Sequence, residues 1–299
     1  MSKRVICGFL RKEMRPRVWA CLFSFLCSLG DVCPCWAQPV YDEADSIRVE
    51  RLLCQAREAE NLASVGRRLM GMPYVAGTLD VDTSAEHLRV NLQGLDCMTF
   101  VETTLALVVA ARTNPTFEGF CRVLQRIRYR EGRVDGYASR MHYFSDWIRN
   151  NPYVDECTAE LVPDARPVCR RIDFMTTHPH LYPALEADSL QLQRMKAVEE
   201  ALSACPAVII DKQRADLRVC LDGLAEGDVV ALTTSVEGLD VTHMGLVVRV
   251  GEEWHLLHAS SAHRCVLVDP LPLTEYLHRQ ARLTGLRVLR LRTSQQTCF

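Results

Sequence analysis

The sequence predicts an α+β fold, because helical patterns come first along the chain and strand patterns follow. Residues 41–71 carry apolar positions at helical spacing, which predicts one or two helices with Ser46 as a cap. Residues 98–112 are apolar around the whole helical circumference, so this helix should be buried on most sides. Short alternating runs then predict an antiparallel sheet: 227–235, 241–250, 252–260, 263–269 and 285–292.

The segments between these two regions are less regular. Residues 136–151 place four apolar side chains on one helical stripe, and a further helix is expected around residues 188–204. The rest of residues 152–225 reads as loops. Since the chain shows no internal repeat, low-complexity tract or linker, we expect a single domain over residues 38–299.

Composition and charge exclude some classes of partner. The chain has 299 residues, 48% of them hydrophobic, and a net charge of -2. Such a balance gives no electrostatic field that would gather nucleic acid or an anionic membrane. No cysteine pair or cysteine–histidine cluster has zinc-finger spacing, so a structural metal site is not expected.

Residues 1–37 resemble a secretory signal peptide. They have a basic lead, an apolar stretch, and the small residues Cys35 and Ala37 before the expected cleavage point. The apolar stretch is shorter than the roughly 20 residues that a membrane-spanning helix needs. The sequence therefore predicts a protein that is exported, to the periplasm or beyond it, with no stable membrane anchor after cleavage.

The cysteine count indicates a free thiol. Five of the 14 cysteines lie within residues 1–37, and an odd number remains in the exported part. Cys157 and Cys169 flank a loop and are candidates for a disulfide, although sequence alone does not decide the pairing.

Cys97 is the candidate nucleophile. It follows Asp96 at the start of the apolar helix, where unpaired backbone N–H groups and the helix dipole favour a thiolate. The alternative is an ordinary buried cysteine. Catalysis would also need a histidine base and a group that orients it.

A predicted hairpin supplies the base. If Gly251 and Glu252 form a two-residue turn, Gly245 lies opposite His258, and His243 becomes the diagonal neighbour of His258 on the same face. Gly245 would leave room for the imidazole of His258. A loop of odd length would instead put the two histidines on opposite faces.

These motifs carry a family resemblance. Asp96-Cys97 opening a buried helix, His-x-Gly on a strand after Gly227-Asp228, and His258-Ala259 ending the next strand resemble the NlpC-type branch of papain-like cysteine peptidases. The resemblance implies a papain-like fold and a triad of Cys97, His243 and His258. The stretch PYVAG also matches, and its Tyr74 is implied to face the active site with its hydroxyl.

Two further stretches resemble a narrower branch of that superfamily. The chain reads DCMTF where most relatives read DCSG, and YASRMHYFSDWI resembles N-acetylmuramoyl-L-alanine amidases that prefer anhydromuropeptides. This implies a cysteine amidase that acts on peptidoglycan fragments through a thioester and requires no metal or organic cofactor. We expect the protein to be a monomer. Substrate contacts are implied for Arg140, His142 and Tyr143, which could otherwise be the polar face of a helix. Asp96 is either the helix N-cap or a residue lining the substrate.

Two alternatives remain open at this point. One is a γ-D-glutamyl-diamino acid endopeptidase on the same scaffold, in which Asp96 would hold the free amine of L-alanine. The other is a muropeptide-binding module without catalytic activity, which would not need all three triad residue types.

Overall fold

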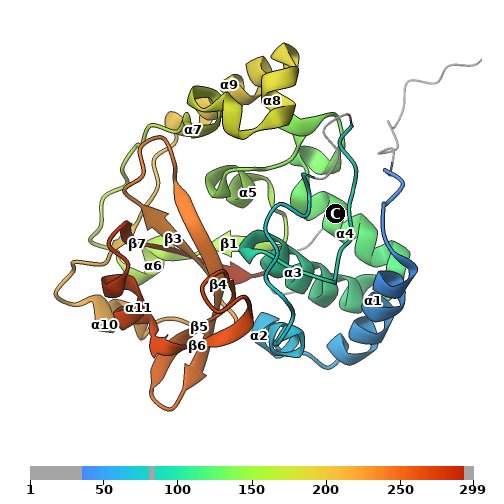
Figure 1. Cartoon of the computed structure of the whole chain (residues 1–299). Helices are drawn as coiled ribbons and strands as arrows, with labels where there is room; N and C mark the ends of the chain where they lie inside the picture. Colours follow the sequence, from blue (N-terminus) through green and yellow to red (C-terminus); the bar gives the residue numbers. More distant parts are fainter. Residues whose placement is uncertain (1–35, 81–84, 293–299) are drawn as a thin grey trace, which may run out of the picture. The chain divides into compact units, whose positions relative to one another are not determined.

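The computed structural model describes residues 36–80 and 85–292 (Figure 1). Within them, the strands form one antiparallel sheet in the order β1-β7-β3-β4-β5-β6, with β2 also paired to β7. The predicted signal of residues 1–37 lies outside the described residues, except for its last two. The strands are β1 Val154–Glu156, β2 Ile210–Asp211, β3 Val229–Thr234, β4 Val241–Val250, β5 Glu253–Ser260, β6 Cys265–Pro272 and β7 Leu283–Leu291.

The helices precede the sheet strands and also fill the connections between them. The prediction of an α+β fold is confirmed. The α-helices are α1 Glu43–Ala56, α2 Leu62–Gly66, α3 Cys97–Thr113, α4 Phe117–Arg128, α5 Phe144–Asn150, α6 Thr158–Leu161, α7 Phe174–Thr177, α8 Pro183–Ala187, α9 Ser189–Ser203, α10 Leu217–Leu221 and α11 Leu273–Arg279.

Each face of the sheet buries its own hydrophobic core. On one face, Leu246 and Leu257 pack with the residues of α1 to α4, and α3 contributes most of its circumference. On the other face, Val247 and Leu256 pack with α10 and α11. Because successive residues of a strand point to opposite faces, β4 and β5 contribute to both cores and are buried on both sides. Figure 1 shows the helical layer of α1 to α4 beside the sheet.

A third, smaller cluster joins α7, α8 and α9. Tyr143, Met175, Leu185, Met195 and Leu202 are its buried members, among others. In Figure 1 this cluster lies above the sheet and above α5. The helix expected around residues 188–204 is confirmed as α9, whereas α7 and α8 form where loops were expected.

The segment 136–151 is not one helix, contrary to the prediction. A short 3₁₀ turn, η3 Tyr137–Ser139, is followed by extended backbone, and α5 begins only at Phe144. Arg140 forms an antiparallel bridge with Tyr129, and the N–H of Met141 donates to the carbonyl of Arg128 at 2.9 Å. These tertiary hydrogen bonds replace the helical ones that the apolar spacing predicted.

The predicted cap Ser46 is also wrong. Asp42 is the N-cap of α1 and accepts from the N–H of Ala44. Ser46 lies inside the helix, where its hydroxyl donates to the carbonyl of Glu43. The carboxylate of Asp42 serves equally well as an acceptor for orphan N–H groups.

The cysteines of the described residues are free thiols, including Cys157 and Cys169. The candidate disulfide between these two is therefore not formed. Among the helices of residues 36–80 and 85–292, none is long and apolar enough to cross a membrane.

Candidate functional site

Cys97 opens α3, and its neighbours fix the start of that helix. Oδ1 of Asp96 accepts from the N–H of Thr99 at 2.8 Å, while the N–H of Asp96 donates to Oγ1 of Thr99 at 2.9 Å. This reciprocal arrangement is a capping box. Asp96 therefore serves as the N-cap, and one of its two carboxylate oxygens is occupied by that role.

The thiol of Cys97 faces backbone donors but is held neutral. Burial, followed by the charge of Asp96, raises the pKa of Cys97 to about 12. The N–H groups of Met244, Met98 and Cys97 itself lower that pKa by a smaller amount. The contact with Met244 places the thiol against β4, at the residue that follows His243. The helix terminus thus favours the thiolate as expected, but desolvation outweighs it.

His243 and His258 come together as the hairpin predicts. The turn pairs Val250 with Glu253, and the register continues to Leu246 opposite Leu257. Nε2 of His243 lies 2.5 Å from Nδ1 of His258.

Gly245 makes this approach of the two rings possible. A Cβ atom built on Gly245 would lie 2.9 Å from Cβ of His258 and 2.8 Å from the carbonyl oxygen of Leu257. Real Cβ atoms essentially never come so close to backbone, so a side chain at this position would displace β5. The space that the sequence predicted beside His258 is confirmed.

Two residues that the sequence reasoning missed surround His258. Nε2 of His258 lies 3.3 Å from Oδ2 of Asp269 on β6, and both side chains are buried. Tyr276 on α11 packs edge-on against His258, with 5.7 Å between ring centroids. Burial, then the charges of Asp269 and Cys97, raise the pKa of Tyr276 to about 12. Tyr276 therefore lies near the thiol as well.

Both histidines are neutral at physiological pH. Burial, then the neighbouring His258, lowers the pKa of His243 to about 3, and the charge of Asp269 opposes this shift. Burial, then His263, lowers the pKa of His258 to about 4. A neutral imidazole has a lone pair that can accept a proton from a thiol.

Tyr74 lies close to the start of α3. A parallel bridge joins Tyr74 to Leu95, just before the start of α3. Burial, then the charges of Cys97 and Asp96, raise the pKa of Tyr74, so its hydroxyl remains a proton donor. The structure thus brings Tyr74, Cys97, His243 and His258 together.

Arg140 does not form part of an exposed polar face. Its guanidinium is buried and forms ion pairs with Asp80 and, at 3.6 Å, with Glu86. The ring of Tyr137 lies against it, 4.9 Å from the guanidinium carbon. Because both carboxylates are held by Arg140, it holds the loop before α3 in place. The expected contact between Arg140 and a substrate carboxylate has no support in this geometry.

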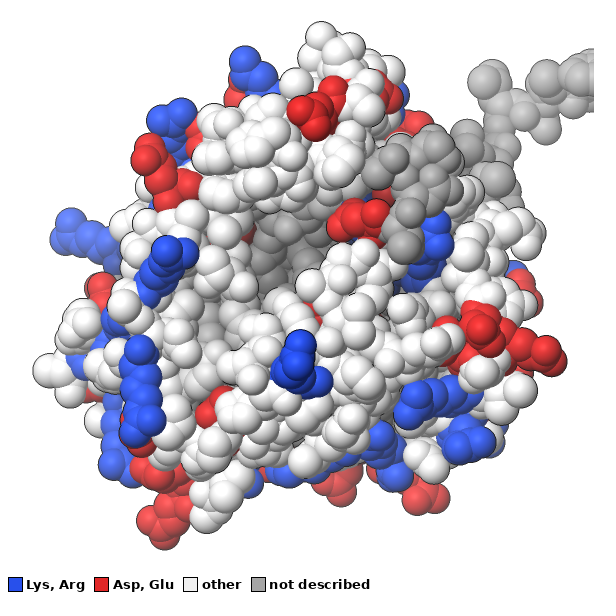
Figure 2. All heavy atoms as spheres, viewed as in Figure 1, with Lys and Arg blue, Asp and Glu red and all other residues white. Residues whose placement is uncertain are grey.

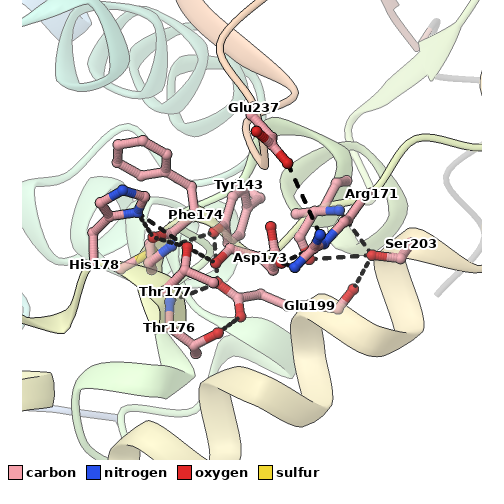
Figure 3. A network of polar contacts seen from close by, with 12 residues as sticks. Tyr143, Arg171, Asp173, Phe174, Thr176, Thr177, His178, Glu199, Ser203 and Glu237 are labelled. Atoms are coloured by element: carbon pink, nitrogen blue, oxygen red, sulfur yellow. Dashed lines mark hydrogen bonds and ion pairs between the residues drawn. The ribbon is translucent and has the colours of Figure 1, made fainter.

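Tyr143 is buried rather than exposed, and its hydroxyl has protein partners. It donates to Oε1 of Glu199 at 2.6 Å and accepts from the N–H of Met175 at 2.9 Å. Figure 3 shows Tyr143 pointing toward Glu199, which also accepts from Thr176. The surface position expected for Tyr143 is wrong, because this side chain anchors α7 to α9.

His142 is half-buried and is also engaged. Its Nε2 lies 2.9 Å from the carbonyl oxygen of Tyr137, and the two rings pack against each other at an angle of 34° with centroids 4.3 Å apart. Burial, then the charge of Arg140, lowers its pKa well below the ordinary value. This neutral ring supports the turn before α5.

The face shown in Figure 2 is hollowed near its centre, with charged side chains of both signs scattered around it. In Figure 1 the same region lies among α3, β4, α5 and the α7–α9 cluster. No group of three or more His, Cys, Asp or Glu that could hold a metal ion occurs in residues 36–80 and 85–292.

A family model and a solved structure that match this chain both carry the name of N-acetylmuramoyl-L-alanine amidases. The family model described as N-acetylmuramoyl-L-alanine amidase-like matches residues 64–285. An N-acetylmuramoyl-L-alanine amidase from Bacteroides uniformis ATCC 8492 is 36% identical in its crystal structure, covering 80% of this chain and 100% of that one, with a TM-score of 0.72.

Two further solved structures are similar. A Bacteroides fragilis protein described as a candidate xylanase is 39% identical, covers 76% of this chain and 99% of its own, and has a TM-score of 0.69. A Legionella pneumophila protein is 18% identical over 84% of this chain and 95% of its own, with a TM-score of 0.66, and this likeness concerns the fold alone. None of the curated proteins matches this chain.

Proposed function

This chain belongs to the N-acetylmuramoyl-L-alanine amidase-like family, and from that premise we propose that it is an exported cysteine amidase. The bond that it hydrolyses is the amide between the lactyl group of N-acetylmuramic acid and L-alanine of the stem peptide. The 1,6-anhydro form of the sugar is the proposed substrate. The fold is assigned to the papain-like, NlpC-type superfamily as part of the same proposal.

One observation carries the proposal. A cysteine at the N-terminus of a buried helix lies against the strand that holds His243, and His243 is in turn bonded to His258. A nucleophile, followed by a base and then by a group that orients the base, is the arrangement by which cysteine hydrolases cleave amides. Nε2 of His243 is taken by His258, which leaves Nδ1 for the thiol.

In the first half of the reaction, Sγ of Cys97 attacks the lactyl carbonyl carbon as Nδ1 of His243 takes the thiol proton. The N–H of Cys97 and the hydroxyl of Tyr74 stabilise the negative oxygen of the tetrahedral intermediate. Its collapse breaks the C–N bond, and His243 gives the proton to the leaving amine of L-alanine. A thioester between Cys97 and the sugar acid remains.

Water completes the cycle. His243 takes a proton from the water that attacks the thioester carbonyl, and the thiol leaves with that proton. The products are the free stem peptide and the sugar with a free lactyl carboxylate. The cycle starts from a neutral thiol and a neutral imidazole. Burial favours both of these protonation states in this site.

The family match, rather than Asp96, favours the amidase over the endopeptidase. An endopeptidase would use the carboxylate of Asp96 to hold a free amine next to the scissile bond. Here Oδ1 accepts from both the N–H and the hydroxyl of Thr99. An amidase that cuts beside the sugar needs no such amine site, but this cap occupies only one carboxylate oxygen and does not decide between the two activities.

Export is proposed from residues 1–37 and the action on peptidoglycan fragments from the family. We propose a monomer, because the proposed triad and Tyr74 come from one chain. N-terminal sequencing of the protein secreted by a bacterial host tests export. A secreted protein whose N-terminal residue is Gln38 supports export with cleavage after Ala37. A protein that still begins at Met1 argues against it.

Product analysis tests the reaction. The exported protein is incubated with reducing and 1,6-anhydro disaccharide-tetrapeptides, and the products are identified by mass spectrometry, with Cys97→Ala as the control. Release of intact stem peptide supports the amidase, and consumption of the anhydro substrate alone supports the sugar preference. Release of a disaccharide carrying L-Ala-D-Glu would show endopeptidase activity instead.

A further inference from the structure

We propose that Asp269 is a positioning residue that fixes the tautomers of both histidines, so that the lone pair of His243 points toward the thiol. This inference rests on the proposed pairing of Cys97 with His243. It adds to the triad a carboxylate that neither the sequence motifs nor the family match identifies.

Asp269 reaches the side of His258 that faces away from His243. Nδ1 of His258 contacts His243, whereas Nε2 lies 3.3 Å from Oδ2 of Asp269. Side-chain exposure is 1% for His258 and 4% for Asp269, so water does not compete for this contact. The alignment falls short of a hydrogen bond. The effect of Asp269 is therefore mainly that of a buried negative charge beside one ring nitrogen.

The backbone places this carboxylate. The pairing of β5 with β6 runs regularly from Ser260 to Leu257 and is interrupted between Leu257 and His255. Asp269 lies at this irregularity, where its carbonyl oxygen contacts Nδ1 of His255 at 2.9 Å, and where Oδ1 accepts from the N–H of Leu271 at 3.0 Å. Irregularities of this kind redirect a side chain away from its regular position. Oδ2 is thereby left for His258.

A carboxylate at this place determines where protons lie along the pair. It can only accept, so the tautomer of His258 with its proton on Nε2 is favoured. Nδ1 of His258 then holds a lone pair and accepts from Nε2–H of His243. Nδ1 of His243 is in turn unprotonated, which is the state that can take the proton of Cys97. With the opposite tautomers, Nδ1 of His243 would already carry a proton and could not accept the proton of Cys97.

The charge of Asp269 also acts on the reaction itself. When His243 accepts the thiol proton it becomes a cation in a buried site, and the negative charge of Asp269 raises its pKa. The other titratable groups around His258 are His243 from β4, His263 from the turn after β5, and Tyr276 from α11. None of these three is a carboxylic acid, so Asp269 is the carboxylate that faces His258.

Nuclear magnetic resonance of ¹⁵N-histidine-labelled protein tests this assignment, with kinetics on the same samples. In the unsubstituted protein at pH 7, His258 should be protonated at Nε2 and unprotonated at Nδ1. In Asp269→Ala, we expect both tautomers at His258 and His243. We also expect kcat to fall on the order of 10²- to 10⁴-fold, as when the orienting carboxylate of a triad is removed, while KM changes less than about threefold.

Two variants separate positioning from packing. Asp269→Asn keeps the volume of the side chain but removes its negative charge, so both tautomers should appear and kcat should fall about as far as in Asp269→Ala. Asp146→Asn removes another buried carboxylate, paired with Arg130, and should leave the tautomers unchanged. If Asp269→Ala fails to fold, Asp269→Asn and the unsubstituted protein still give the tautomer readout.

Three results would overturn the proposal. They are a proton on Nδ1 of His258 in the unsubstituted protein, unchanged tautomers in Asp269→Ala, and an unchanged kcat in that variant. Because the tautomers are read without substrate, failure of the proposed amidase activity is a separate result: it would appear as no turnover by the unsubstituted protein, whatever the histidine signals show.

Discussion

The rings of His243 and His258 meet edge-on, with 4.8 Å between centroids and an angle of 80° between planes. They come from adjacent strands of one hairpin, so the register of that hairpin decides whether they meet. Both cores of the sheet hold β4 and β5 in this register. The positions of the two histidines are therefore fixed by the same packing that stabilises the fold.

Gly245→Ala should reduce kcat by on the order of tenfold or more, since a displacement of about 1 Å in an active site has effects of this size. The added Cβ meets backbone and Cβ of β5 and moves His258 away from His243. Steady-state kinetics with a disaccharide-tetrapeptide measure the effect.

Gly66→Ala is the matched control. There the new Cβ meets the side-chain ends of Leu246, Leu257 and Phe100, which can shift. It should lower the free energy of unfolding but leave kcat within about twofold, because its contacts on the sheet are with the side chains of Leu246 and Leu257, which point to the face opposite to His258. Equal losses of kcat in both variants would show that the effect of Gly245→Ala is not specific to the histidine pair.

Labelling of Cys97 by iodoacetamide should rise about tenfold per pH unit between pH 7 and pH 10. With a pKa of about 12, the thiolate fraction of Cys97 grows in proportion to hydroxide over this range. Peptide mapping by mass spectrometry separates Cys97 from the exposed Cys54 and Cys169. A rate that is constant from pH 6 to pH 8 would instead show a preformed thiolate–imidazolium pair.

Tyr74→Phe should lower kcat on the order of 100-fold, as the loss of one oxyanion donor does. KM should change little, because the hydroxyl acts mainly on the transition state. Tyr41→Phe, at an exposed tyrosine, is the control. A rise in KM with unchanged kcat would place Tyr74 in substrate binding only.

Tyr143→Phe should lower the free energy of unfolding by about 1–3 kcal/mol and leave kcat within about twofold. The substitution removes a donor to Glu199 and an acceptor for the N–H of Met175. Urea unfolding measures the change, with Tyr153→Phe as a control at a half-buried tyrosine. A large rise in KM without loss of stability would restore the substrate contact that the sequence suggested.

Local patterns in the sequence were sufficient to predict the helix that begins at Cys97 and the hairpin of β4 and β5. Residues 98–112 are apolar around the whole helical circumference. This pattern predicts a helix that is buried on most sides, as α3 is. Gly251 and Glu252 predict the turn, and counting from it gives the approach of His243 to His258. Both depend on contacts that are close in sequence.

The other features of the site depend on contacts between segments that are distant in the sequence. Asp269 reaches His258 through an irregularity in the pairing of β5 with β6, which no alternating pattern reveals. Tyr276 comes from α11, a helix that follows β6 directly. Arg140 could not be placed because its partners Asp80 and Glu86 lie in an irregular loop some 60 residues earlier.

Identifying the acyl group that Cys97 carries during turnover tests the central claim most directly. The protein is mixed with anhydro disaccharide-tetrapeptide, quenched with acid within the first turnover, and mapped by mass spectrometry. We predict an adduct on Cys97 with the mass of the sugar acid and no amino acid, and no turnover by Cys97→Ala. An adduct that includes L-Ala-D-Glu, or turnover by Cys97→Ala, would contradict the account.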